Sequence, residues 1–165
     1  MRVLSGQEHT DAFGYIIHAA ESAQKALCLN AHCGAVVIHG GTIVGRGYNG
    51  PPRDDLSKRY CKNTIRPQKK NYDKTCCVHA EWRAIVDALR HIKNLSGSRL
   101  YFVRVDDKGD IKKSGKPYCT VCSRLALDAG ISEFILWHEE GICVYNTEEY
   151  NDMSYCYGTQ YNGVL

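Results

Sequence analysis

Two short segments constrain the fold of this chain more than any other feature. The first is His79-Ala80-Glu81, and the second, forty residues later, holds Cys119 and Cys122 at CxxC spacing. Imidazole and thiolate are good zinc ligands, and three protein ligands leave the fourth tetrahedral position open for water, as in catalytic sites. We therefore predict that His79, Cys119 and Cys122 bind one zinc ion, and that Glu81 carries protons beside it. The alternative is a purely structural zinc knot, but no clean second pair of ligands completes one.

Both ligand segments are expected at the starts of helices. Cys119 and Cys122 are three residues apart, so they share one face of the opening turn of the helix that they begin. The partial positive charge of a helix N-terminus stabilises thiolate, the form of cysteine that binds metal. His79 begins another helix and can meet the two cysteines across the space between the helices.

Hydrophobic periodicity elsewhere is typical of an α/β layered domain. A continuous apolar run suits a strand buried on both faces, and His39-Gly40-Gly41 joins it to a second strand as a hairpin. Helices and strands alternate after the hairpin, so helices should cover both faces of the sheet. The tyrosine-rich segment near the end has no firm assignment. Three helices are expected: one at 11–28 that Thr10 or Asp11 can cap, one that begins at His79 and stops at Ser96-Gly97, and one at 120–129. Strands are expected at 33–38, 42–48, 99–105 and 132–137.

The length of 165 residues predicts a single domain, residues 1–165, in which charge is segregated. A basic insert at about 53–75 holds eight Lys or Arg against three Asp between Arg53 and Lys74. The acidic, tyrosine-rich tail from about residue 139 has five acidic residues and no Lys or Arg. Such a basic run is most often a solvated surface, so it points only weakly to an anionic partner.

Targeting signals are missing from the sequence pattern. No apolar run approaches the ~20 residues needed to span a membrane, and the first residues lack the apolar core of a signal peptide. We therefore expect a cytoplasmic protein with no membrane partner.

Nine cysteines are too many for the zinc site alone. The count is odd and cytosolic thiols stay reduced, so metal binding or burial is favoured over disulfides. Cys61, Cys76 and Cys77 lie in or beside the basic insert, where they are either part of a second metal site or ordinary thiols, and we favour ordinary thiols. The remaining four have apolar or aromatic neighbours and are predicted to be small core residues: Cys28, Cys33, Cys143 and Cys156.

Taken together, these motifs resemble the zinc-dependent cytidine/deoxycytidylate deaminase superfamily. An H-x-E segment paired with P-C-x-x-C is the signature of zinc deaminases, and here Tyr118 separates Pro117 from the first cysteine. The resemblance runs from about Cys33 to Trp137. The element Gly47-Tyr48-Asn49-Gly50 makes it closest to the deoxycytidylate (dCMP) deaminase branch.

The resemblance implies both a fold and an activity. The fold would be a three-layer α/β/α sandwich on a five-stranded mixed sheet, usually assembled as a homo-oligomer. The activity would be hydrolytic deamination of a cytosine nucleotide, with dCMP to dUMP the leading candidate. Zinc-bound hydroxide would attack the ring carbon while Glu81 transfers protons. Asn49 would lie by the sugar, Arg53 follows it within reach of the 5′-phosphate, and Ala80 completes the predicted substrate-binding residues.

Two other functions stay open at this point. The first is a deaminase of another base or of RNA, similar to the tRNA adenosine deaminases. The basic insert would supply cationic surface for phosphates, but the acidic tail opposes it, so nucleic acid is a disfavoured partner that is not excluded. The second is a zinc-stabilised interaction module without catalysis, against which an intact Glu81 argues.

Overall fold

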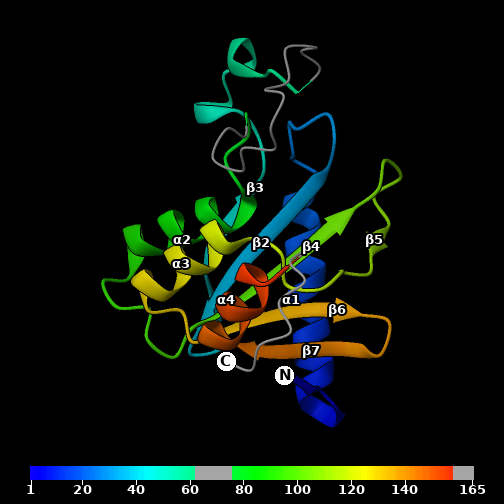
Figure 1. Ribbon diagram of the computed structural model, residues 1–165, viewed down its shortest axis with the longest axis vertical. Helices are drawn as coiled ribbons and strands as arrows, with labels where there is room; N and C mark the ends of the chain where they lie inside the picture. Colours follow the sequence, from blue (N-terminus) through cyan, green and yellow to red (C-terminus); the bar gives the residue numbers. More distant parts are fainter. Residues whose placement is uncertain (62–75, 158–165) are drawn as a thin grey trace.

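A seven-stranded mixed sheet organises the computed structural model, which describes residues 1–61 and 76–157 (Figure 1). The strands lie in the order β1-β7-β6-β4-β2-β3, and β5 pairs with β4 outside this path. Strands β4 and β6 are parallel, whereas the other neighbours are antiparallel. The strands are β1 (Arg2–Val3), β2 (His32–His39), β3 (Thr42–Tyr48), β4 (Arg99–Val105), β5 (Ile111–Lys112), β6 (Glu133–His138) and β7 (Gly141–Asn146). The helices are α1 (Gly6–Ala23), α2 (Ala80–His91), α3 (Thr120–Ala129) and α4 (Thr147–Tyr155), with two short 3-10 helices, η1 (Pro52–Asp54) and η2 (Leu56–Lys58).

Helices cover both faces of the sheet, which confirms the predicted α/β/α layers. Helix α1 packs on one face, behind the sheet in Figure 1, and α2, α3 and α4 lie on the other. The sheet has two strands more than the five predicted, because β1 and β5 have only two residues each and are too short to show periodicity. Among the described residues, no helix combines the length and apolar character needed to cross a membrane.

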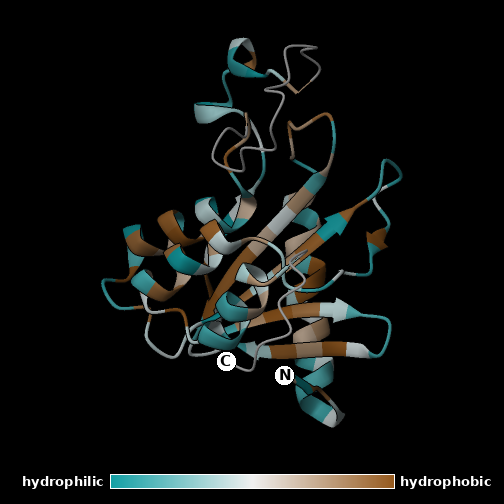
Figure 2. Cartoon of the chain, viewed as in Figure 1, coloured by the Kyte–Doolittle hydropathy of each residue, from teal (hydrophilic) through white to brown (hydrophobic). Residues whose placement is uncertain are grey.

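Strand β2 shows how the core is built. Ala35 and Val37 join the cluster of buried side chains under α2 and α3, whereas Val36 and Ile38 join the cluster under α1. Successive side chains of a strand point to opposite faces, so an unbroken apolar run serves both layers. Figure 2 shows the resulting hydrophobic band along the central strands, and the predicted burial of this strand on both faces is confirmed.

The first helix differs from its prediction at both ends. It begins at Gly6 rather than residue 11, and it ends at Ala23 rather than residue 28. Small residues such as Ala19 form much of its buried face, and the backbone oxygen of Ala19 comes so close to Gly34 that a Cβ there would lie 2.0 Å away. Phe13, nearer the start of the helix, is 38% exposed and packs edge-on against Trp137.

Helix α2 lies unusually close to β3. A Cβ added at Gly47 would lie 2.1 Å from the oxygen of Ala80, and one at Gly45 would lie 2.2 Å from the oxygen of Ala84. Both glycines therefore allow the helix backbone to rest on the strand, which fixes the position of the residues that begin the helix. The helix ends at His91, several residues before the predicted stop.

The cysteines predicted to be small core residues divide into two pairs. Cys28 and Cys143 are buried as expected, whereas Cys33 and Cys156 are only partly buried, which corrects the prediction for these two. Cys33 lies in β2 at the margin of the core, packed against one cluster of buried side chains. Cys156 follows the last residue of α4, beyond the helix that would cover it.

The acidic tail, which had no assignment, forms β7 and α4. Tyr145 and Tyr150 are buried on the face shared with α2, and the Tyr150 ring stacks on Phe134 with centroids 4.1 Å apart. The Tyr145 hydroxyl lies 2.9 Å from Nε2 of His138. Tyr145 and Tyr150 are therefore core residues, whereas Tyr155 and Tyr157 are exposed. The basic insert is described only as far as Cys61, and residues 62–75 lie outside the described part of the chain.

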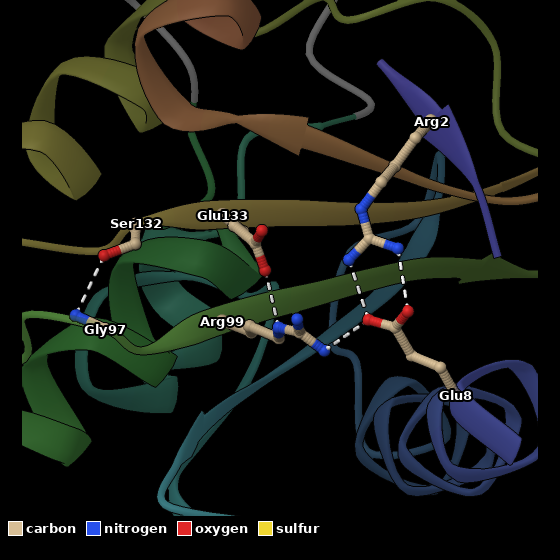
Figure 3. A network of polar contacts seen from close by, with 6 residues as sticks. All are labelled: Arg2, Glu8, Gly97, Arg99, Ser132 and Glu133. Carbon is tan, nitrogen blue, oxygen red and sulfur yellow. Dashed lines mark hydrogen bonds and ion pairs between the residues drawn. The ribbon is translucent and has the colours of Figure 1, made fainter.

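A polar network ties the start of the chain to the sheet near the N-terminal end of α1 (Figure 3). Arg2 donates two hydrogen bonds of 2.7 Å to the carboxylate of Glu8. Arg99 lies 3.1 Å from the same carboxylate and 2.5 Å from that of Glu133. The network links β1, α1, β4 and β6.

Candidate metal centre and active site

The ligand atoms of His79, Cys119 and Cys122 converge; we call these residues the His79 cluster. Nδ1 of His79 lies 3.1 Å from the Cys122 sulfur and 3.4 Å from the Cys119 sulfur, and the two sulfurs are 3.0 Å apart. Tetrahedral zinc, with Zn–S of about 2.3 Å and Zn–N of about 2.0 Å, separates such atoms by about 3.5–3.8 Å. An outward adjustment of a few tenths of an ångström would therefore admit the ion. One imidazole and two thiols are a donor set that fits zinc.

Each ligand segment begins a helix, as the sequence predicts. His79 is the N-cap of α2, and Cys119 is the N-cap of α3, where its sulfur accepts a hydrogen bond from the Cys122 amide at 3.4 Å. Backbone hydrogen bonds also pair Val78 with Gly50 at the end of β3. The cluster is therefore held by two helix starts and by the sheet below them.

The thiol of Cys119 is prepared for metal binding. Its pKa falls to about 4, mainly through its hydrogen bond with Cys122 and despite burial, which acts in the opposite direction. The hydrogen bond to Cys119 raises the pKa of His79 in return. The Cys119 thiolate therefore lies beside an imidazole that tends to carry positive charge. A bound metal cation would stabilise the thiolate in place of that charge.

Glu81 lies in the first turn of α2 and is buried, with 5% of its surface exposed. Burial is the main reason why its pKa lies above the ordinary carboxyl value, and the neighbouring His79 acts against the shift. A raised pKa makes a carboxyl group able both to accept and to release a proton near neutral pH. The position therefore suits a proton carrier beside the His79 cluster.

Two of the predicted substrate-binding residues, Asn49 and Ala80, have different surroundings in the structure. Asn49 is buried, and its side chain accepts from the Cys33 amide at 2.9 Å and donates to the Ala31 oxygen at 2.8 Å. One amide hydrogen and one lone pair are left for a ligand. Ala80 is fully buried at the start of α2. Their contact with a substrate stays a prediction.

Arg53 occupies a strained turn beside the site. Its φ of 56° and that of Asp54, 59°, lie in the left-handed region that few residues other than glycine adopt. Its side chain is exposed, and it has no hydrogen bond or ion pair with any other described residue. Strain of this kind persists only where the surroundings impose it.

Arg83 is the residue that imposes this turn, and the sequence analysis missed it. Its guanidinium donates at 2.6 Å to the Asp54 carboxylate and at 2.6 Å to the Pro51 oxygen. Tyr48 donates to the same carboxylate at 2.5 Å, and its ring lies under the guanidinium, 4.9 Å away. The signal was available in the spacing, because Arg83 follows His79 by one helical turn and so shares its face of α2.

The tail contributes to the site as well. Burial is the main reason why the pKa of Tyr150 is raised, and Glu81 and Cys122 add to the effect. Tyr150 of α4 belongs to the same group of buried side chains as Ala80, which begins α2. Ser123, next to Cys122, is buried with its hydroxyl 3.0 Å from the Thr120 oxygen and 2.9 Å from Asn151 of α4. These contacts join α3 to a helix that the sequence pattern did not reveal.

Comparison with known proteins identifies the family. The sequence model described as "Cytidine and deoxycytidylate deaminase zinc-binding region" matches residues 9–138, which contain the whole His79 cluster. A deoxycytidylate deaminase of Schizosaccharomyces pombe is 30% identical over 76 residues, or 44% of this chain. The match spans 24% of the length of that curated relative.

Solved structures share the fold at low sequence identity. A dCMP deaminase from the cyanophage S-TIM5 superposes with a TM-score of 0.52 at 21% identity, covering 79% of this chain and 82% of the phage protein. A cytidine deaminase from Burkholderia pseudomallei gives a TM-score of 0.56 at 17% identity, with 84% and 94% covered. The matched sequence region and the shared fold lead to one assignment: this chain belongs to the zinc-binding cytidine and deoxycytidylate deaminase family.

Proposed function

We propose that this protein catalyses the hydrolytic deamination of a cytosine nucleotide, with dCMP as the leading substrate. The observation that carries the proposal is the burial of Glu81 beside three metal ligands that leave one tetrahedral position open. A purely structural site has no need of a buried carboxyl group with a raised pKa at this place. Similarity to a curated deoxycytidylate deaminase and to a phage dCMP deaminase solved with dCMP and dUMP supports this choice of substrate.

The residues of the chain divide the chemistry between them. His79, Cys119 and Cys122 would hold the zinc ion, which supplies the Lewis acidity that lowers the pKa of a water molecule to about 7. Glu81 accepts a proton from the attacking water and delivers it to the ring nitrogen. The oxygen of water forms a bond to C4 of cytosine, and Glu81 then takes up the second proton of that water from the new C4 hydroxyl group. Glu81 passes this proton to the amino group as its bond to C4 breaks, which releases ammonia and leaves the C4 carbonyl. The products are the uracil nucleotide and ammonia.

The test of this mechanism is Glu81→Gln. The substitution keeps the size and most of the packing of the side chain but removes its ability to carry a proton. We expect zinc content and unfolding temperature close to those of the wild type, with kcat lowered by about 10²–10⁴. Glu140→Gln, at an exposed carboxylate in the turn between β6 and β7, is the matched control and should leave kcat unchanged. Ammonia release by Glu81→Gln at the wild-type rate would refute the mechanism.

Arg53 is the proposed contact for the 5′-phosphate. The Arg83–Asp54 ion pair fixes the turn, Arg53 is exposed and has no partner among the described residues, and the preceding Gly50 pairs with Val78 beside the cluster. Arginine binds phosphate through strong, often bidentate hydrogen bonds. Arg53→Ala should therefore raise KM for dCMP and leave deoxycytidine unaffected, whereas Lys58→Ala, a nearby exposed cation, should change neither. Equal kcat/KM for dCMP and deoxycytidine in the wild type would exclude a nucleotide-specific enzyme.

The substrate screen should extend beyond cytosine. Ammonia release from cytosine, adenine and guanine nucleosides and nucleotides distinguishes the proposed reaction from deamination of another base. A short RNA added to the same panel tests the tRNA-type alternative.

Assembly as a homo-oligomer remains part of the proposal. Val86 and Leu89 are 48% and 43% exposed on α2, and Trp82, one turn earlier, is 37% exposed. Their spacing places them on one outward stripe of the helix, which a second copy of the chain would cover. Light scattering at micromolar concentration should show an oligomer that Val86→Glu weakens, and a monomeric wild type would contradict the proposal.

A further inference from the structure

A second group of sulfur atoms lies outside the His79 cluster. Cys28, Cys61 and Cys77 have their sulfurs within 4.8 Å of one another, and Cys76 lies 3.0 Å from Cys61 and 3.7 Å from Cys77. The distance from Cys61 is 4.0 Å to Cys28 and 3.7 Å to Cys77. We call these four residues the Cys28 cluster. The prediction that the cysteines beside the insert are ordinary thiols did not anticipate this convergence.

The four cysteines come from three places in the chain. Cys28 lies beyond the end of α1, Cys61 follows η2, and Cys76 and Cys77 lie in a bend just before Val78. Adjacent residues of a strand would point their side chains to opposite sides, but the bend brings the sulfurs of Cys76 and Cys77 to the same side. Burial of individual cysteines in a core would not by itself require four of them to converge in this way.

Few apolar contacts hold this end of the molecule. In Figure 2 the short helices η1 and η2 are mainly hydrophilic, and the larger apolar side chains there, Leu56 and Tyr60, are 55% and 53% exposed. The local backbone is held instead by hydrogen bonds, from Arg59 to the Leu27 oxygen and from Leu27 to the Asn49 oxygen. A covalent or metal cross-link is the usual way to order a segment that lacks a core of its own.

The distances distinguish between these two kinds of cross-link. A disulfide needs sulfurs about 2.05 Å apart, whereas four thiolates around one zinc ion lie about 3.8 Å apart at a Zn–S distance of about 2.3 Å. For four of the six sulfur pairs, the separations of 3.7, 3.7 and 4.0 Å match the zinc geometry, and that of 3.0 Å between Cys61 and Cys76 lies between the two values. Cys76 lies outside the group of three whose sulfurs are all within 4.8 Å of one another, so it would have to shift to complete a set of four ligands. Four-cysteine sites of this kind are closed and structural.

We propose that Cys28, Cys61, Cys76 and Cys77 bind a second, structural zinc ion. On binding, the thiols release their protons to solvent and no oxidant is required. The ion would connect the segment that follows β3 and η2, which contains Cys61, to Cys77 just before His79. The bridge between Val78 and Gly50 joins the same two segments. It would therefore hold the turn of Arg53 and the first ligand of the His79 cluster in one rigid unit.

Metal analysis of the full-length protein tests this proposal without reference to catalysis. Protein purified under reducing conditions should contain about two zinc ions per chain. Cys61→Ser should contain about one, and Cys156→Ser, which changes a cysteine at the end of α4, should keep both. Cys119→Ser should also retain one ion, and X-ray absorption should show it surrounded by about four sulfur atoms.

A wild-type measurement keeps the proposal falsifiable if a variant fails to fold. X-ray absorption of the wild-type protein should give an average of about three sulfur neighbours per zinc ion, whereas occupation of the His79 cluster alone gives about two. One zinc ion per chain, with the same content in Cys61→Ser, would overturn the proposal. A Cys61–Cys76 disulfide found by mass spectrometry in freshly reduced and desalted protein would also overturn it. Absence of deaminase activity would leave these metal counts unchanged, so the two proposals fail separately.

Discussion

The His79 cluster and the Cys28 cluster use the same chemical groups but differ in what holds those groups in place. Two ligands of the first are the N-caps of α2 and α3 and the third lies in the first turn of α3, over a sheet whose glycines let α2 rest on β3. The ligands of the second come from a bend, a turn and the segment after α1, where few apolar side chains are buried. One cluster is built on the core, and the other lies where the core ends.

This difference predicts different responses to metal. A site whose ligands are fixed by packing keeps its geometry when the ion leaves, whereas a site on irregular backbone obtains part of its order from the ion. Disturbing the scaffold should therefore damage the His79 cluster most. Removing the metal should damage the surroundings of the Cys28 cluster most.

The largest effect is expected from Gly47→Ala. The new Cβ would lie 2.1 Å from the Ala80 oxygen and 2.4 Å from the Ala84 nitrogen, and neither backbone atom can move without displacing α2. We expect the free energy of unfolding to fall by about 3 kcal/mol or more, because overpacking against rigid backbone is costly. Zinc should be lost from the His79 cluster before it is lost from the Cys28 cluster, as measured by denaturant titration and metal analysis.

Gly14→Ala is the matched control for this substitution. Gly14 lies within α1, and nothing is within 4 Å of the position that a Cβ would take. Alanine should therefore stabilise the helix, by up to about 1 kcal/mol. If Gly47→Ala were as harmless as Gly14→Ala, the close packing of α2 on β3 would not be what positions the cluster.

The second effect is local and concerns the Cys28 cluster. The amides of Lys58 and Arg59 are hydrogen-bonded within the η2 turn, to Asp55 and Leu56. In Cys61→Ser they should exchange with deuterium at least about tenfold faster, which corresponds to about 1.4 kcal/mol of lost protection. Amides of α2 should exchange as in the wild type. Equal acceleration at both places would mean that the two clusters share one scaffold, against the comparison above.

The same difference explains what the sequence could predict. His79 with Glu81, and Cys119 with Cys122, are found by spacing because the two residues of each pair lie within one helical turn, and the apolar run of β2 reveals the central strand. The Cys28 cluster is assembled by tertiary structure from cysteines up to 49 positions apart, and local pattern carries no information about such contacts. Helix α1 was misplaced at both ends because its buried face is made of alanines, which periodicity weighs little. The tail was left unassigned because its tyrosines, which form part of the core, read as polar.

A third effect, of about 1 kcal/mol, is expected from Ser123→Ala. The hydroxyl links α3 to Asn151 of α4 next to a proposed ligand, and a single neutral hydrogen bond contributes about 0.5–1.5 kcal/mol. Ser154 of α4 can still donate to Oγ1 of Thr120 in α3 at 3.2 Å, so the helices should stay docked. Zinc content should be unchanged, since packing holds the His79 cluster redundantly. Ser96→Ala, at an exposed hydroxyl, is the control and should change stability by less than about 0.5 kcal/mol.

The smallest effect belongs to the network of Figure 3, whose ion pairs have good geometry but are only partly buried, so that it separates the effect of geometry from that of burial. The hydrogen bonds from Arg2 are the main cause that lowers the pKa of Glu8 from 4.5 to about 2. Because the pKa of Glu8 is lower in the folded protein, its ionised carboxylate stabilises the fold at pH values above the ordinary carboxyl pKa. This stabilisation is lost as the pH falls towards about 2. Because 38% of the Glu8 side chain is exposed, solvent screens the interaction, and Glu8→Gln should cost less than about 1 kcal/mol at neutral pH. The difference between Glu8→Gln and wild type should shrink between about pH 4.5 and pH 2, measured by denaturant unfolding at each pH. A cost at neutral pH above that of Ser123→Ala would mean that geometry outweighs burial in this protein, and the contrast between its two clusters would then need another explanation.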